Sequence, residues 1–165
     1  MDFDANGMLP AGLHDYTVDQ FITQFVDGFP TSQRRKQIAD VLFDSFAREI
    51  LTYGIPFEFW IDGSYVTTKV NPNDADLVLF FQYIDLKKLQ PHITMLRQKY
   101  AQHLDTYYVC AASPENQKFL HPDVFHKVVN DRNYWRGQFG FDRSDNPKGI
   151  VRLSCNSLLE YLNRR

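Results

Sequence analysis

The sequence predicts a single domain of the α/β or α+β class, and three observations lead to this prediction. Two amphipathic helical patterns come first, and apolar strand-like segments then alternate with helical ones. The chain has 165 residues, which is the size of one domain. Hydrophobic residues make up 44% and charged residues 23%, as in ordinary globular proteins, so disorder, collagen and coiled coil are excluded as the overall class.

Two helices are expected in the N-terminal third of the chain. Residues 1–16 contain Gly7, Pro10 and Gly12 and are interpreted as a loose entry segment. Apolar side chains at helical spacing predict a helix over about 17–26, with Thr17 as its N-cap. A longer helix is predicted over about 32–53, and Gly54 is a natural residue to follow its end.

Strand-like segments begin where the helical period ends. Strands are predicted at 56–61, 74–82 and 105–111, and a helix at 85–103 connects the last two. After its first aspartates the segment 74–82 is almost continuously apolar, which is typical of a strand covered on both faces. Strands that alternate with helices are therefore expected in this part of the chain.

The C-terminal third is expected to alternate again between helices and extended segments. The sequence predicts a loop at 113–118, a helix at 121–137, a turn-rich segment at 140–148, a short strand at 150–154 and a final helix at 157–163. The domain would then have a core of about 32–111, an N-terminal helical segment 1–31 and a C-terminal helix and loop segment 112–165.

Charge and cysteine usage exclude several functional classes. There are 18 Lys and Arg against 20 Asp and Glu, a net charge of −2, which makes binding to long nucleic acid unfavourable. Cys110 and Cys155 form no CxxC pair, so a structural zinc site is not expected. No apolar run is long enough to cross a membrane and the N-terminus lacks a basic leader, so we expect a cytoplasmic protein.

One motif carries the strongest chemical signal. Gly63 and Ser64 follow a predicted strand, and nine residues later Asp74 and Asp76 open the next one. Side chains two positions apart on a strand point to the same face, so these carboxylates would repel each other unless a cation lay between them. Hard oxygen ligands favour Mg²⁺ or Mn²⁺, held together with substrate phosphates.

The neighbouring residues fit the same chemistry. Glycine lets the backbone approach a phosphate closely, and Ser64 offers a hydroxyl and an N–H group. Asp105 opens the following predicted strand and would supply a third carboxylate, either as a metal ligand or as the base for an attacking hydroxyl. Asp62 precedes Gly63, and a role in bonding to the turn backbone is favoured over catalysis.

At these residues the sequence resembles the DNA polymerase beta-like nucleotidyltransferase superfamily. It looks most like the minimal stand-alone branch, which includes short antitoxin-type proteins and uncharacterised bacterial and phage proteins. The resemblance implies a mixed sheet backed by helices and the transfer of a nucleoside monophosphate from a nucleoside triphosphate to a hydroxyl. It implies phosphate contacts for Gly63 and Ser64, and metal binding and catalysis for Asp74, Asp76 and Asp105.

Further candidates come from basic and aromatic residues. Lys69 lies between the two halves of the motif, and a cluster of cations near glycines could clamp a triphosphate or acceptor. That cluster consists of Arg136, Arg143, Lys148 and Arg152. Tyr134, Trp135, Phe139 and Phe141 are read as a packed junction between helix and loop, with a stacking wall for a base as the alternative.

Two functional hypotheses follow, with a structural protein as a third. The first is a Mg²⁺-dependent nucleotidyltransferase that uses ATP or another triphosphate, with a protein, a small molecule or an RNA end as acceptor. The alternative is a catalytically weak or inactive binding protein of the same fold, such as an antitoxin or a phage-encoded partner of another protein. Under either, the expected partners are a nucleoside triphosphate and a toxin or modification target, and not a membrane.

Overall fold

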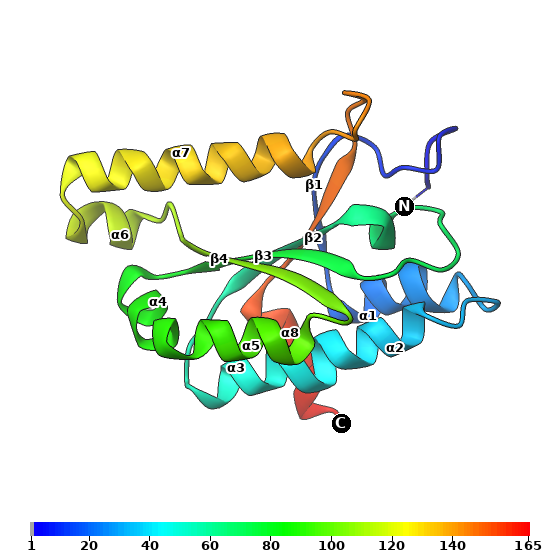
Figure 1. The fold of residues 1–165 in the computed structure, drawn as a ribbon, viewed down its shortest axis with the longest axis horizontal. Coiled ribbons are helices and arrows are strands. Elements are labelled where there is room, and N and C mark those ends of the chain that lie inside the picture. Colours follow the sequence, from blue (N-terminus) through cyan, green and yellow to red (C-terminus); the bar gives the residue numbers. More distant parts are fainter. Residues whose placement is uncertain (1) are drawn as a thin grey trace.

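The computed structural model describes residues 2–165, and its centre is one five-stranded mixed sheet (Figure 1). The strands are β1 (Gly12–Tyr16), β2 (Glu58–Asp62), β3 (Ala75–Phe81), β4 (Leu104–Cys110) and β5 (Gly149–Leu153). Their order across the sheet is β1-β5-β2-β3-β4. Strand pairs β1–β5 and β3–β4 are parallel, whereas β2 is antiparallel to both β3 and β5. The predicted α/β class with a mixed sheet is therefore confirmed.

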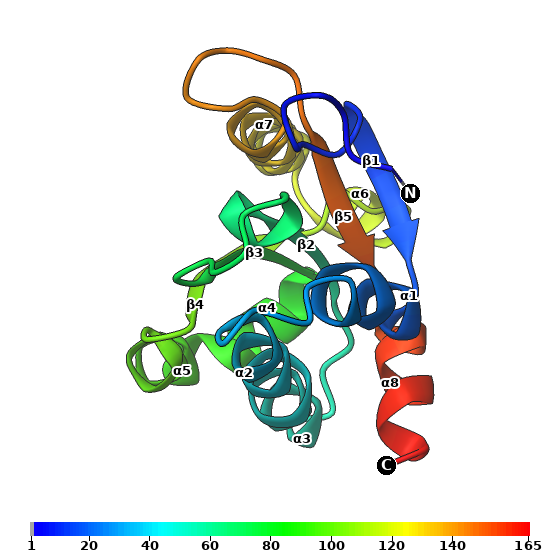
Figure 2. The same ribbon diagram turned by 90° about the vertical axis from the view of Figure 1, so that its right-hand side faces the viewer.

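One face of the sheet carries most of the helices. The helical elements on this side are α1 (Val18–Ile22) with its π-helical continuation Thr23–Asp27, the continuous run α2 (Arg35–Asp40), Val41–Ala47 and α3 (Arg48–Thr52), then α4 (Tyr83–Leu89), α5 (Ile93–Tyr100) and α8 (Cys155–Asn163). Figures 1 and 2 show all of them on the same side of the sheet. The larger hydrophobic core lies here, and it includes phenylalanines from α1, from the long helical run and from β2 and β3.

The opposite face is covered by α6 (Pro114–Phe119) and the long helix α7 (Pro122–Phe139) (Figure 1). A smaller apolar cluster joins the sheet to α7, with Trp60, Val78 and Phe80 from the strands and Phe139 from the helix. A short 3₁₀ helix, Gly63–Val66, follows β2, and the segment 140–148 leads from α7 into β5. The apolar cluster on this face is small, and polar side chains at the ends of β2 and β3 line a cavity instead of being buried in it.

Two segments differ from the prediction. Residues 1–16 are not only a loose entry segment, because Gly12–Tyr16 forms β1, and the N-terminal segment is therefore not purely helical. This strand is held by parallel pairing with β5, a partner far along the chain, so its local sequence carries little signal. The predicted loop at 113–118 is helix α6, which Ser113 caps by accepting a hydrogen bond from the N–H of Asn116.

The other predicted elements lie close to their expected positions. The helices at 17–26, 32–53, 85–103, 121–137 and 157–163 and the strands at 56–61, 74–82, 105–111 and 150–154 are present with boundaries shifted by a few residues. Within residues 2–165, none of the helices combines the length and apolar character needed to cross a membrane.

Candidate functional site

Three aspartates lie side by side across three neighbouring strands, and we call them the carboxylate row: Asp62, Asp76 and Asp105. Asp62 ends β2 and pairs in register with Asp76 of β3, which in turn pairs with Asp105 of β4. Residues in register on adjacent strands project from the same face of a sheet. The row therefore places three carboxylates on the face that α7 covers.

Asp76 lies at the centre of the row and is partly buried. Burial and the negative charges of Asp74, Asp62 and Asp105 raise the pKa of Asp76 to about 6, and Lys148 opposes this shift only in part. Asp74 stands one residue before β3 begins, so its carboxylate acts at the entrance of the strand. The predicted acidic residues thus interact electrostatically, and Asp62 joins them as a fourth.

Asp62 is the most deeply buried member of the row. Only 3% of its surface is exposed, and its Oδ2 accepts a hydrogen bond from Nζ of Lys148 at 2.6 Å. Burial raises the pKa of Asp62, while the Lys148 ammonium acts in the opposite direction. A hydrogen bond with the Gly63 backbone also lowers the pKa of Asp62, as expected for a residue at the turn, and the ion pair with Lys148 is an additional contact that the sequence did not predict.

The turn after β2 is built around Gly63. Its φ is +77°, a conformation that residues with a Cβ rarely adopt. A Cβ atom built on Gly63 would lie 1.8 Å from Oδ2 of Asp76, which is far too close for any side chain. Glycine is therefore required here both for the backbone conformation and for the space that the Asp76 carboxylate occupies. Ser64 follows within the 3₁₀ helix, as the sequence suggested for a helical turn.

A cavity of about 720 Å³ opens beside the row. It is lined by Asp62 and Asp76, by Gly63 and Ser64, and by Arg143 and Lys148 from the segment between α7 and β5. Its aromatic lining comprises Tyr107, Tyr134, Trp135, Phe139 and Phe141. Tyr134 and Phe141 are 57% and 47% exposed, so flat apolar surface remains accessible at this cavity.

Asp105 adjoins the cavity through Tyr107. The Tyr107 hydroxyl donates to Oδ2 of Asp105 at 2.8 Å, and the Tyr107 ring packs on Trp135 of α7 with centroids 4.3 Å apart. This hydrogen bond, together with burial, raises the pKa of Tyr107 to about 12. Asp105 itself is exposed, and neither it nor Asp74 lines the cavity directly.

Not all predicted phosphate contacts come together. Gly63, Ser64, Arg143 and Lys148 line the cavity, but Lys69 and Arg136 do not. Arg136 is exposed on α7, beside the cavity-lining residues of that helix. Lys69 was predicted to contact phosphate only because it lies close to the motif in the sequence. In the structure, the loop that carries Lys69 is held through its backbone by another residue.

That residue is Arg35, which sequence reasoning missed. Its guanidinium is fully buried and donates to the backbone carbonyls of Phe25, Tyr65, Thr67 and Lys69 at 2.6–3.2 Å. Burial lowers the pKa of Arg35 to about 10. These contacts immobilise the segment that connects Gly63 and Ser64 with Asp74. Arg35 stands at the start of α2 between Arg34 and Lys36, so the sequence offers no signal that separates it from its solvated neighbours.

The carboxylates of the site fit a magnesium ion whose other ligands come from a substrate. Carboxylate oxygens are the ligands that Mg²⁺ prefers, and a cation would relieve the repulsion among the aspartates that, together with burial, raises the pKa of Asp76. Within residues 2–165, however, no group of three or more His, Cys, Asp or Glu is arranged to hold a metal ion. A cation held by one or two carboxylates together with phosphate oxygens therefore fits better than one enclosed by protein alone.

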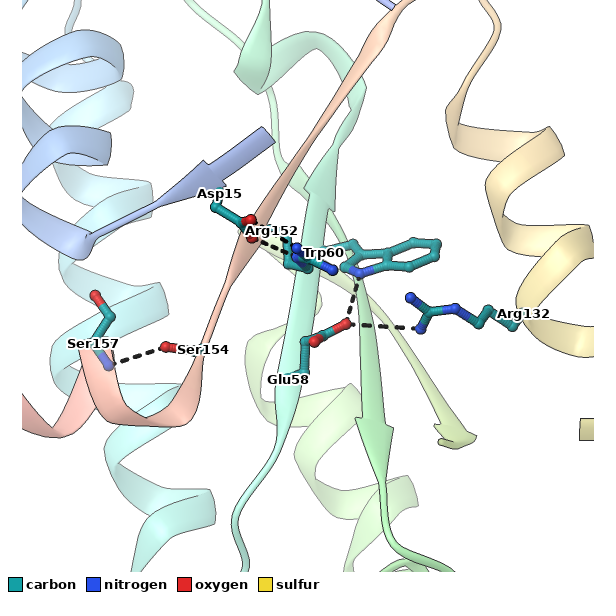
Figure 3. A network of polar contacts seen from close by, with 7 residues as sticks. All are labelled: Asp15, Glu58, Trp60, Arg132, Arg152, Ser154 and Ser157. Atoms are coloured by element: carbon teal, nitrogen blue, oxygen red, sulfur yellow. Dashed lines mark hydrogen bonds and ion pairs between the residues drawn. The ribbon is translucent and has the colours of Figure 1, made fainter. Parts of the chain in front are cut away.

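A second polar cluster lies on the same face of the sheet, and we call it the arginine network: Asp15, Glu58, Arg132 and Arg152 (Figure 3). Arg152 binds Asp15 through two hydrogen bonds, and Glu58 accepts one from the Trp60 indole at 3.0 Å. The Arg132 guanidinium lies 3.8 Å from Glu58 and 4.8 Å from the centre of the Trp60 ring. Arg152, a predicted clamp residue, is thus engaged with Asp15.

Fold and site together define an α/β protein whose mixed sheet carries a row of carboxylates at an open, partly aromatic cavity. Residues 1–154 match the family model DUF6932, which is described as a family of unknown function, and the chain belongs to that family. No curated protein and no solved structure matches the chain. The matched region contains the whole sheet, the carboxylate row and Lys148.

Proposed function

We propose that this protein is a metal-dependent nucleotidyltransferase, which transfers a nucleoside monophosphate from a nucleoside triphosphate to a hydroxyl group. The observation that carries the proposal is the carboxylate row beside Gly63: Asp76 is in register with Asp105 and follows Asp74 by two residues, and burial together with the charges of these neighbours raises its pKa. The resemblance of the Gly63–Ser64 and Asp74–Asp76 motif to the polymerase beta-like superfamily supports the same assignment.

Each residue would have a defined part in binding. Asp74 and Asp76 would hold the metal ion at the entrance of β3, with Asp105 as a further carboxylate. A bound Mg²⁺ would neutralise charge on the phosphates and stabilise the charge that develops during transfer. The Gly63 turn and Ser64 would contact the phosphates, and Arg143 and Lys148, which also line the cavity, would supply positive charge.

The reaction balances without any further reactant. The oxygen of the acceptor hydroxyl forms a bond to the α-phosphorus, and the bond from that phosphorus to the oxygen bridging the β-phosphate breaks. Pyrophosphate leaves with the electron pair, and the hydroxyl proton passes to a carboxylate. Asp105 suits this last task because it is exposed and its Oδ2 is oriented by the Tyr107 hydroxyl.

A labelling experiment tests the proposal. The protein is incubated with Mg²⁺, cell lysate and ATP, GTP, CTP or UTP labelled at the α-phosphate, and in parallel with triphosphates labelled at the γ-phosphate. We expect an acceptor to carry the α-label and not the γ-label. The variant Asp74→Ala/Asp76→Ala should transfer none, and labelling equal to the wild type by this variant would refute the assignment.

A binding protein without catalysis is the second candidate. It would have the same fold and act as an antitoxin or as a phage-encoded partner of another protein. Calorimetry separates the two candidates, because an enzyme must bind a triphosphate in the presence of Mg²⁺ or Mn²⁺. If no triphosphate binds and a stable complex with a protein encoded by a neighbouring gene forms, the binding protein is the better description.

A further inference from the structure

The ion pair between Lys148 and Asp62 lies at the wall of the cavity and is almost completely enclosed. Nζ of Lys148 is 2.6 Å from Oδ2 of Asp62, and the two side chains are only 12% and 5% exposed. Both residues line the cavity, and the pair joins the end of β2 to the residue that precedes β5. The ammonium group is therefore held beside Asp76, the strand partner of Asp62.

The backbone of Lys148 is fixed independently of this ion pair. Its N–H donates to the carbonyl of Gly140 at 2.8 Å, and the next N–H, that of Gly149, donates to Leu9 at 2.9 Å. The position of the backbone is thus determined by main-chain contacts. The side chain of Lys148 is flexible, and within the described chain its ammonium group has one hydrogen-bond acceptor, Asp62. Asp62 therefore determines where the positive charge lies.

Stability alone does not explain this ion pair. Desolvation makes a buried ion pair no better for stability than well-packed apolar side chains, as a rule. In addition, Oδ1 of Asp62 is buried and has no hydrogen-bond partner within the described residues, which is unfavourable. The arrangement is better explained by the charge that it places at the cavity than by its contribution to folding.

We propose that Asp62 is a positioning residue: it keeps the Lys148 ammonium paired with its own carboxylate rather than with that of Asp76, so that the ammonium can contact the phosphates of a triphosphate bound in the cavity. This inference rests on the proposed function. An ammonium group has three N–H donors, and the bond to Asp62 uses one of them, so the others are available for phosphate oxygens. Asp76 is the strand partner of Asp62, and its charge interacts with the Lys148 ammonium. Without Asp62 we expect Lys148 to pair with Asp76, where the ammonium would compete with the metal.

The test measures two affinities for four proteins. Calorimetry gives the Kd for Mn²⁺ alone and the Kd for a nonhydrolysable triphosphate in the presence of Mn²⁺. The proteins are the wild type, Asp62→Asn, Lys148→Met and the double variant. Asp15→Asn is the matched control, because Asp15 also forms an ion pair on this face of the sheet but lies outside the cavity.

The expected pattern is specific. Lys148→Met weakens triphosphate binding about 10- to 100-fold, as expected for a charged hydrogen bond, and leaves Mn²⁺ binding unchanged or tighter. Asp62→Asn weakens both, because Lys148 then pairs with Asp76. The double variant recovers Mn²⁺ binding and binds triphosphate no worse than Lys148→Met. The control Asp15→Asn retains both affinities.

Other results overturn the inference in distinguishable ways. If the wild type binds the triphosphate and Asp62→Asn binds it equally well, Asp62 has no positioning role, although the proposed function stands. If the double variant fails to recover Mn²⁺ binding, the competition at Asp76 is refuted. If the wild type binds no triphosphate, the inference and the proposed function fail together.

A measurement on the unaltered protein covers the case in which Asp62→Asn does not fold. In protein labelled with ¹⁵N-lysine, the Lys148 ammonium is assigned by its absence from Lys148→Met. We expect its protons to exchange slowly with water because the group is enclosed, and its resonance to shift when the triphosphate is added. A resonance that does not shift on triphosphate binding would overturn the inference.

Discussion

The carboxylate row and the arginine network lie on the same face of the sheet but differ in charge balance. In the arginine network two carboxylates, Asp15 and Glu58, face two guanidinium groups. In the row, the three aspartates and the neighbouring Asp74 face one enclosed cation, Lys148. Burial, and after it the negative charges of the other aspartates, raise the pKa of Asp76. A balanced cluster needs no ligand, whereas an excess of negative charge at a cavity is relieved by a bound cation.

The largest effect is expected for Asp76→Asn, which removes the central charge of the row. We expect triphosphate binding with Mg²⁺ to weaken by about a hundredfold or more, since a metal ligand is lost. The matched control is Glu58→Gln, which removes a carboxylate from the arginine network and should leave binding unchanged. Calorimetry with a nonhydrolysable triphosphate measures both, and equal losses for the two variants would contradict the comparison.

A somewhat smaller effect is expected for Gly63→Ala. The added Cβ would clash with the Asp76 carboxylate, and alanine is strained at a φ of +77°. We expect the free energy of unfolding to fall by about 1–3 kcal/mol and metal binding to weaken because Asp76 must move. Gly54→Ala is a control with a similar φ of +67° but open space around the Cβ position. It should lose stability without losing metal binding.

The pH dependence of stability is a third way to test the row. The pKa of Asp76 is raised from its ordinary value of 3.8 to about 6 in the folded protein. Its contribution to stability is therefore fully present below about pH 4 and is lost as the pH rises through about 6. Without metal, the protein should thus gain stability from Asp76 when the pH falls from 7 to 5.

The size of this effect follows from comparison with Asp76→Asn. At pH 7 the variant should be more stable than the wild type by about 1–2 kcal/mol, a value reduced for partial solvent exposure, and the difference should shrink at pH 5. Burial lowers the pKa of His103, so His103 makes both proteins less stable as the pH falls. This contribution is the same in both and cancels when their free energies of unfolding are subtracted. Urea unfolding at the two pH values measures the difference, and a constant difference would contradict the raised pKa.

The elements of the fold could largely be predicted because their signals are local. The apolar stripe of the long helical run and the apolar run of β3 are each visible in one stretch of sequence. Strand β1 was not predictable in this way, since its partner β5 lies at the other end of the chain. Helix α6 was missed although Ser113 and Pro114 form a typical helix start.

The site was predictable only where its residues share a motif. Gly63, Ser64 and Asp76 lie at one cavity, as their spacing indicated. Asp62 was assigned to the turn because its neighbours in the row, Asp76 and Asp105, become neighbours only through strand register. Register depends on pairing across the whole sheet, and a change of one residue would turn these side chains to the other face.

The smallest effect is expected for Arg152→Met, which tests the balanced cluster. Arg152 was a predicted clamp residue, but its guanidinium binds Asp15, whose side chain is 72% exposed. An exposed ion pair contributes little, so we expect a loss of about 0.5–1 kcal/mol in the free energy of unfolding and unchanged triphosphate binding. Thermal unfolding and calorimetry measure the two quantities. A tenfold loss of triphosphate affinity would show that the arginine network also contributes to ligand binding. It would contradict the distinction drawn between the two clusters.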